Sequence, residues 1–362
     1  MSDENKDIVL SVKNLSVGFL SHGKKMNVIR DVSIDVHRGE TFAIVGESGS
    51  GKSVFTKTFT GMLDSNGFIS SGSIMFDGID LAKLKKSKDW FGIRGKRIAT
   101  IFQDPMTSLN PLFSIGYQIE EVLRIHHGLN HEEAKKEAIN LLRKVRIPDP
   151  EQRIKEFPFQ YSGGMRQRVV IAIALACRPE ILICDEPTTA LDVTVQAQIL
   201  QLIRDLQTEY HWTTIFITHD LGVVANVADR IAVMYGGQIV EYGTAEDIFY
   251  RPAHPYTWAL LSSLPQLGTK NEPLVYIKGN PPSFNSEIIG DAFAIRNDYA
   301  MKIDYVAEPP MFKISETHFA KTWLLDPRAP KVEKPIIIQH LRERIDAAAK
   351  ELGREVGNND GK

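Results

Sequence analysis

Short, uninterrupted runs of apolar residues recur along most of the chain. They lie at 41–45, 98–102, 181–184, 214–218 and 231–235. Runs of this length and composition are typical of strands that are covered on both faces of a sheet. Longer segments with helical spacing separate them, so the pattern predicts an α/β domain built on a mostly parallel sheet.

One of the intervening segments shows the helical pattern in full. Asn130 is placed to cap its N-terminus, Glu133 follows at the third helical position, and Pro148 closes the segment. The apolar residues between them fall on one stripe: Ala134, Ala138, Leu141, Leu142 and Val145. We therefore expect an amphipathic helix that buries this stripe.

The pattern changes after about residue 265. Proline- and glycine-rich breaks follow at 264–265, 272–273, 279–282 and 308–310. Such breaks predict a domain over 1–265 and a loop-rich extension over 266–362.

The end of this extension returns to helical spacing. Its apolar residues are three and four positions apart: Ile338, Leu341, Ile345, Ala348 and Leu352. Gly353 stands where a helix commonly ends, so we expect one amphipathic helix here. The polar tail 358–362 is predicted to be disordered.

Composition narrows the class of protein. The 362 residues carry 43 basic and 45 acidic side chains and two cysteines, which argues against a broad polyanion-binding surface or a disulfide scaffold. The longest apolar run, Val169–Cys177, is too short for a bilayer span of roughly 20 residues. Residues 1–7 lack the apolar stretch of a signal peptide. We therefore expect a cytosolic chain with no membrane segment of its own.

A glycine-rich stretch directly after the run at 41–45 matches the phosphate-binding P-loop in every fixed position. It comprises Gly46, Glu47, Ser48, Gly49, Ser50, Gly51, Lys52 and Ser53. Glycines let backbone N–H groups curl around phosphate oxygens, and a following helix aims its positive end at the same anion. Lys52 is expected to reach the β- and γ-phosphates, and Ser53 to ligate Mg²⁺.

Polar residues follow three of the other predicted strands. Gln103 comes after 98–102, Asp185 and Glu186 after 181–184, and His219 after 214–218. Ligands of open α/β sheets bind at the carboxyl ends of strands, so these side chains should meet the P-loop. Asp185 is the candidate Mg²⁺ ligand and Glu186 the candidate general base for an attacking water. Alone, Gln103 and His219 would be interpreted as structural; their strand-end positions favour function.

The stretch 161–168 resembles the signature sequence of ABC-type ATPases. Other motifs match in the same order: a Q-loop at 102–104, a Walker B strand with its glutamate at 181–186, a D-loop at 190–192 and a switch histidine within 218–220. The resemblance covers roughly residues 8–260. It implies a P-loop NTPase fold with a RecA-like parallel core, an antiparallel β subdomain and a small helical subdomain at about 105–165.

The resemblance also assigns roles. It implies ATP and Mg²⁺ as ligands, with Mg²⁺ held by Ser53, Gln103 and Asp185, and with Glu186 and His219 acting on water and γ-phosphate. The remaining implied site residues are Phe19 against adenine, Asp192 in the D-loop, and Ser162, Gly163, Gly164 and Met165 against ATP bound to a partner cassette. A head-to-tail dimer of cassettes follows from this last role.

Several classes of ABC protein remain to be separated. Cassettes that act on DNA usually carry long insertions, whereas here only residues 104–161 lie between Gln103 and Ser162. Translation factors carry two cassettes per chain, whereas this chain has one P-loop and one signature. A separate importer-type ATPase subunit remains. The basic stretch 83–97 is interpreted as a solvated face, and no nucleic-acid partner is expected. A regulatory module without turnover is the alternative from another class, and Glu186 and His219 argue against it.

The extension specifies the importer further. The stretches 251–257, 279–283 and 307–312 resemble the C-terminal region of oligopeptide, dipeptide and nickel importer ATPases. The resemblance implies an oligopeptide importer ATPase that is peripheral on the cytoplasmic face of the cell membrane. Its implied partners are a second, non-identical ATPase, two membrane permeases and an extracellular peptide-binding protein. Import of dipeptides or nickel stays open as the alternative.

One feature departs from that subfamily. Many of its members carry four cysteines that can hold an iron–sulfur centre. Here the corresponding residues are Asp291, Asn297, Asp304 and Thr322. Since these side chains cannot replace four thiolates, we expect no iron–sulfur cluster and an extension held together by packing.

Overall fold

The computed structural model describes residues 7–21, 23–189, 191–225, 227–264, 267, 276–284 and 286–345. Its strands are β1 (Ile8–Ser21), β2 (Lys24–His37), β3 (Thr41–Val45), β4 (Gly67–Phe76), β5 (Ile79–Asp80), β6 (Ile98–Ile101), β7 (Ile181–Asp185), β8 (Thr213–Thr218), β9 (Arg230–Tyr235), β10 (Gln238–Thr244), β11 (Phe312–Lys313) and β12 (Phe319–Ala320). Its α-helices are α1 (Lys52–Lys57), α2 (Pro105–Ser108), α3 (Ile115–His127), α4 (His131–Lys144), α5 (Pro150–Arg153), α6 (Gly163–Ala176), α7 (Val193–Tyr210), α8 (Leu221–Val224), α9 (Ala245–Tyr250), α10 (Pro255–Ser262) and α11 (Ile336–Gln339).

The larger sheet has the strand order β11-β12-β10-β9-β3-β8-β7-β6. Strands β9, β3, β8, β7 and β6 run parallel, and each of them is one of the apolar runs predicted above. This confirms the predicted α/β class. Strand β3 shows why its run is continuous. Phe42 and Ile44 pack into one hydrophobic core, and Ala43 and Val45 pack into another on the opposite face.

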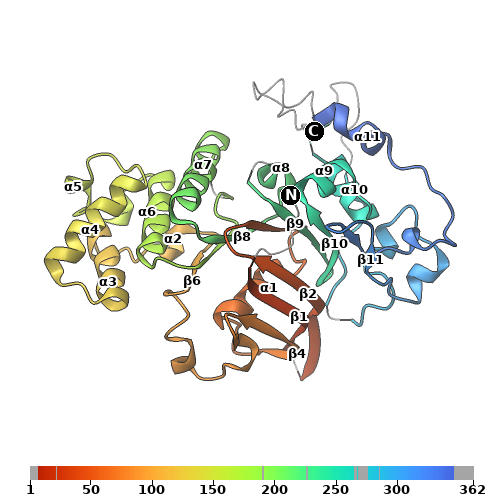
Figure 1. Cartoon of the computed structure of the whole chain (residues 1–362), viewed down its shortest axis with the longest axis horizontal. Coiled ribbons are helices and arrows are strands. Elements are labelled where there is room, and N and C mark those ends of the chain that lie inside the picture. Colours follow the sequence, from red (N-terminus) through yellow and green to blue (C-terminus); the bar gives the residue numbers. More distant parts are fainter. Residues whose placement is uncertain are drawn as a thin grey trace.

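A smaller antiparallel sheet, β2-β1-β4-β5, covers one of these faces. Helices α6 and α7 contribute to the core on the other face. Figure 1 shows α3, α4 and α5 at one end of the molecule, in the range where the helical subdomain is expected, and the extension in blue at the other end.

Helix α4 begins as predicted. The Asn130 side chain accepts a hydrogen bond from the Glu133 N–H (3.0 Å), and the Glu133 carboxylate accepts one from the Asn130 N–H (3.0 Å). The stripe from Ala134 to Leu142 is buried in the core. The capping pair therefore fixes the start of the helix and the stripe fixes its orientation.

The C-terminal helix is interrupted. Helix α11 ends at Gln339, a turn at His340 follows, and residues 341–345 are helical again. Ile338 and Leu341 are buried in the larger core. The predicted positions Ala348, Leu352 and Gly353 and the tail 358–362 lie outside the described residues. Among the described residues, no helix is long and apolar enough to cross a bilayer.

The extension joins the larger sheet instead of standing apart. Strand β12 pairs antiparallel with β10, with Ala320 opposite Glu241 and Phe319 opposite Tyr242. Strand β11 then pairs with β12. Residues 265 and 266, where the predicted boundary falls, lie outside the described residues.

Candidate nucleotide-binding site

A cleft of about 920 Å³ lies at the carboxyl ends of the parallel strands. The predicted residues that line it are Glu47, Ser48, Gly49, Gly51, Lys52, Ser53, Gln103, Glu186 and His219. They come from four separate places in the sequence, and parallel pairing of β3, β6, β7 and β8 brings them to one edge. This is where an open α/β sheet binds its ligand.

The loop between β3 and α1 is curled into a cradle. A Cβ on Gly46 would lie 2.1 Å from the carbonyl oxygen of Met234, so only glycine fits there. Gly51 has φ +106°, a conformation that other residues rarely adopt. The Lys52 ammonium donates to the carbonyl oxygens of Gly46 (2.7 Å) and Glu47 (3.0 Å). Because these carbonyls point toward the lysine, the N–H groups of the loop are left to face an anion.

The loop also has unmet bonding capacity. The Ser50 hydroxyl is buried and has no hydrogen-bond partner in the described part of the chain. A Cβ on Gly49 would meet open space, so that side of the loop is accessible. Both observations fit a phosphate group in the cradle.

Buried charges of both signs meet beside the loop. Burial lowers the pKa of Lys52, although the nearby carboxylates of Glu186, Asp185 and Glu47 act in the opposite direction. Burial likewise raises the pKa of Asp185, and a hydrogen bond from Ser53 partly offsets this. The Ser53 hydroxyl donates to Asp185 Oδ1 at 3.0 Å. A hydroxyl and a carboxylate in contact form the hard-oxygen donor set that suits Mg²⁺.

Glu186 is the point at which the other polar residues meet. Its Oε2 accepts hydrogen bonds from Gln103 Nε2 (3.0 Å) and Thr189 Oγ1 (2.9 Å). Its Oε1 lies 3.2 Å from His219 Nδ1. Glu186 also has φ +47°, which costs on the order of 1–3 kcal/mol for a residue other than glycine. Glu186 thus combines a strained backbone with contacts to an amide, a hydroxyl and an imidazole. This combination is typical of a catalytic position.

The signature residues lie elsewhere. Ser162 caps α6, its Oγ accepting from the Met165 N–H at 3.4 Å. Gly164 packs so closely on α7 that a Cβ there would lie 2.7 Å from a methyl group of Val195. Asp192 caps α7 by accepting from the Val195 N–H at 3.0 Å. Among the described residues that line the cleft, none belongs to the signature, so the chain does not bring its own signature to its own phosphate loop.

Phe19, the residue implied to contact adenine, lies in the smaller sheet. It lies in β1, is 9% exposed, and its ring contacts Gly67. It does not line the cleft, whereas Val28 and the exposed ring of Tyr276 do. Its contact with adenine therefore stays a prediction. The lining residues that sequence reasoning missed are Val28, Val54, Thr189, Leu260, Ser263, Tyr276 and Ile277, and no motif marks them.

The four residues at the expected cysteine positions are all buried, and each makes a local hydrogen bond to backbone. The pairs are Asp291 Oδ1 with the Phe293 N–H (2.9 Å), Asn297 Oδ1 with the Tyr299 N–H (3.0 Å), Asp304 Oδ2 with the Met301 N–H (2.6 Å), and Thr322 Oγ1 with the Leu324 N–H (3.3 Å). Each side chain thus closes a turn by itself. The two cysteines, Cys177 and Cys184, are buried in the cassette, and burial raises the pKa of Cys177 to about 11.

Asp291 should make the stability of the protein depend on pH. Burial raises its pKa to about 6, Asp304 and Glu308 add to the rise, and the Phe293 N–H and Lys321 oppose it. Since the folded state favours the protonated acid, the free energy of unfolding should fall as pH rises from about 4 to about 6. Above that range the loss of stability is complete. Asp291→Asn should therefore raise the free energy of unfolding at pH 8 by up to about 3 kcal/mol and change it little at pH 4. Chemical denaturation at both pH values checks this, and equal differences would contradict it.

Two arginines of the basic stretch are engaged within the protein. Arg94 donates to the carbonyl oxygens of Thr60 and Gly61. Arg97 pairs with Glu180 and Asp77. These contacts favour a structural and solvated role for 83–97.

Comparisons with known proteins agree with this geometry. The family "ABC transporter" matches residues 29–189, and the family "Oligopeptide/dipeptide transporter, C-terminal region" matches residues 240–303. The chain is 60% identical over 342 residues to the oligopeptide transport ATP-binding protein AmiE of Streptococcus pneumoniae, covering 94% of this chain and 96% of that protein. It is 56% identical over 325 residues to the dipeptide transport ATP-binding protein DppD of Lactococcus lactis, covering 90% and 93%.

A solved structure extends the similarity to the fold. The ATP-binding cassette MJ0796, a dimer in a post-hydrolysis state bound to ADP and Pi, superposes with a TM-score of 0.58 at 28% identity. The match covers 65% of this chain and 98% of that cassette. Together with the cleft and the two matching families, these similarities show that the chain belongs to the ATP-binding subunits of ABC transporters, in the group that carries the oligopeptide/dipeptide transporter C-terminal region.

Proposed function

We propose that the chain is the ATPase subunit that powers import of oligopeptides through a membrane ABC transporter. The observation that carries this proposal is the meeting of Gln103 and His219 on Glu186, beside the phosphate loop and within one chain whose extension is of the peptide-transporter type. The cleft supplies the chemistry, and the extension indicates the cargo.

The geometry supports a defined division of labour. The loop and Lys52 bind the ATP phosphates, and Glu186 takes a proton from the attacking water. His219, on the other oxygen of Glu186, positions the γ-phosphate and the water. Ser53, Gln103 and Asp185 would hold Mg²⁺, which offsets phosphate charge when bound. Phosphoryl transfer depends mostly on such positioning and electrostatics.

A second cassette completes the site in this proposal. The signature, Ser162 to Met165, begins a helix of 14 residues that does not line the chain's own cleft. A partner's signature would then lie over each nucleotide, and the similarity to the MJ0796 cassette, which is a dimer, supports a dimer of cassettes. We propose a second, homologous ATPase as the partner, with two permeases and an extracellular peptide-binding protein, at the cytoplasmic face of the cell membrane. Nucleic acid is not among the proposed partners.

The extension is proposed to work without an iron–sulfur centre, because buried polar side chains close the turns where thiolates would be needed. Iron and sulfide analysis of the purified chain tests this, and stoichiometric iron would contradict it.

A dipeptide importer is the second candidate, because DppD is nearly as similar in sequence as AmiE. Nickel import and a regulatory role without turnover have less support. Co-purification of the tagged chain from native membranes should recover a second ATPase, two permeases and a peptide-binding protein. Transport in proteoliposomes should then be faster for oligopeptides than for dipeptides. Faster dipeptide transport would favour the second candidate, and recovery without permeases would overturn the proposal.

A further inference from the structure

The extension reaches the phosphate loop through one arginine. Arg296 closes the short 3-10 helix Ala294–Arg296, and its side chain is only 4% exposed. Its guanidinium donates to both carboxylate oxygens of Glu47, at 2.5 and 3.0 Å. Glu47 is the second residue of the phosphate loop, so the pair joins residues 249 positions apart. A bidentate pair of this kind fixes direction as well as distance.

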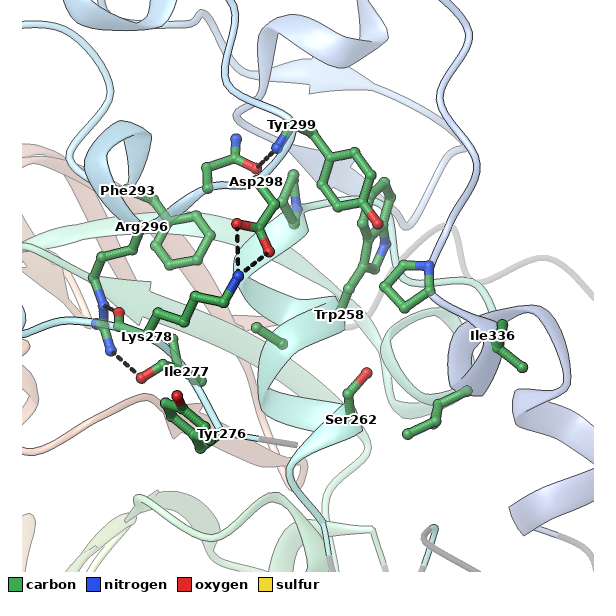
Figure 2. A pocket seen from close by; sticks show the side chains of 15 residues that line it. Trp258, Ser262, Tyr276, Ile277, Lys278, Phe293, Arg296, Asp298, Tyr299 and Ile336 are labelled. Carbon is green, nitrogen blue, oxygen red and sulfur yellow. Dashed lines mark hydrogen bonds and ion pairs between the residues drawn. The ribbon is translucent and has the colours of Figure 1, made fainter. Parts of the chain in front are cut away.

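The other donors of Arg296 are also used. They reach the Tyr235 hydroxyl (3.1 Å) and the carbonyl oxygens of Lys278 (2.7 Å) and Ile277 (3.4 Å). All five N–H donors of the guanidinium are thereby engaged. Figure 2 shows Arg296 in the wall of a second cavity of about 410 Å³, beside the backbone of Ile277 and Lys278. Ile277 lines the nucleotide cleft as well, so one side chain holds both the loop and the cleft wall.

Glu47 is held from its backbone too. Its N–H donates to the Tyr256 hydroxyl at 2.8 Å, and its carbonyl oxygen accepts from Lys52. The Tyr256 ring packs with Tyr235 and with Phe293 of the extension, at centroid distances of 4.5 and 5.3 Å. These rings are at most 2% exposed. The first turn of the phosphate loop is therefore clamped between the cassette and the extension.

We propose that Arg296 is a positioning residue for nucleotide binding, which acts through Glu47 to hold the phosphate loop ready for ATP. The loop needs such support, because its glycines are costly to order and because it turns its own carbonyls toward Lys52. Holding a loop in its bound shape before the ligand arrives raises affinity, since less ordering remains to be done. The extension thereby sets the ATP affinity of the cassette. This inference rests on ATP binding in the cleft and not on the identity of the cargo.

Arg296→Met should raise the KM for ATP roughly tenfold in the assembled complex and change kcat less than about twofold. The dissociation constant of a fluorescent ATP analogue, measured on the full-length chain, should rise in parallel. Arg296→Lys keeps a charge and a donor, so it should restore part of the loss. Lys278→Met is the matched control, because it removes an exposed ion pair with Asp298 in the same segment, and it should leave both constants unchanged.

A double-mutant cycle with Glu47→Gln tests whether the effect passes through that residue. In the Glu47→Gln background, Arg296→Met should change KM less than about twofold. If Arg296→Met raised KM as much in that background as in the wild type, the proposal would be overturned. An unchanged KM in Arg296→Met would overturn it too, and so would a variant in which only kcat and the melting temperature fall. If Arg296→Met does not fold, Arg296→Lys decides, and wild-type KM and affinity in that variant would overturn the proposal. Peptide transport is not part of the readout, so a wrong cargo would leave this test intact.

Discussion

Glu186→Gln should lower the ATP turnover of the assembled transporter by about 10²- to 10⁴-fold while ATP still binds. Glutamine keeps the shape of the side chain and can still contact Gln103 and Thr189, but it cannot accept a proton from water. The phosphate loop and Lys52 do not depend on this carboxylate for their conformation. Steady-state hydrolysis and equilibrium binding of ATP, measured on the same preparation, separate the two effects.

Glu180→Gln is the matched control for this prediction. Glu180 directly precedes β7, at the end opposite Glu186, and pairs with Arg97. Its loss removes contacts with Arg97 and Arg38, so it should cost some stability. Because these contacts lie at the far end of β7, turnover should stay within about twofold. Turnover that survives Glu186→Gln would show that another group removes the proton.

The parts of the fold that the sequence predicts are those encoded over short distances. The run 41–45 reads as a doubly covered strand because its four apolar residues, Phe42 to Val45, alternate between two cores on opposite faces. Asn130 and Glu133 mark a helix start because their side chains bond to each other's backbone. The phosphate loop is also marked locally, since Gly49 and Gly51 have positive φ values (+80° and +106°) that other residues rarely adopt.

The parts that escaped prediction depend on distant partners. Strand β12 has only two residues, and it is a strand because β10 offers it an edge. Arg296 lies in a loop-rich segment and nothing near it indicates Glu47 as its partner. The spacing of residues along the sequence does not reveal such long-range contacts.

A buried pair where the extension attaches to the larger sheet should contribute strongly to the free energy of unfolding. Glu241 and His318 are both at most 1% exposed, and Glu241 Oε1 lies 2.7 Å from His318 Nε2. The carboxylate also accepts hydrogen bonds from the N–H groups of Ala253 (2.7 Å) and His254 (2.9 Å). His318→Ala leaves this buried carboxylate without its side-chain partner and opens a cavity, so the free energy of unfolding should fall by about 3–5 kcal/mol.

His340→Ala provides the matched comparison, because His340 pairs with Glu343 at the surface of the same extension. Its loss should change stability by less than about 0.5 kcal/mol. His318→Gln retains a donor toward Glu241 and should recover part of the loss, which separates the missing hydrogen bond from the cavity. Urea denaturation followed by tryptophan fluorescence measures all three variants. If His318→Ala and His340→Ala lowered stability equally, the buried pair would contribute no more than a surface pair. The contact between β10 and β12 would then depend on its backbone hydrogen bonds and on the stacked rings of Tyr242 and Phe319.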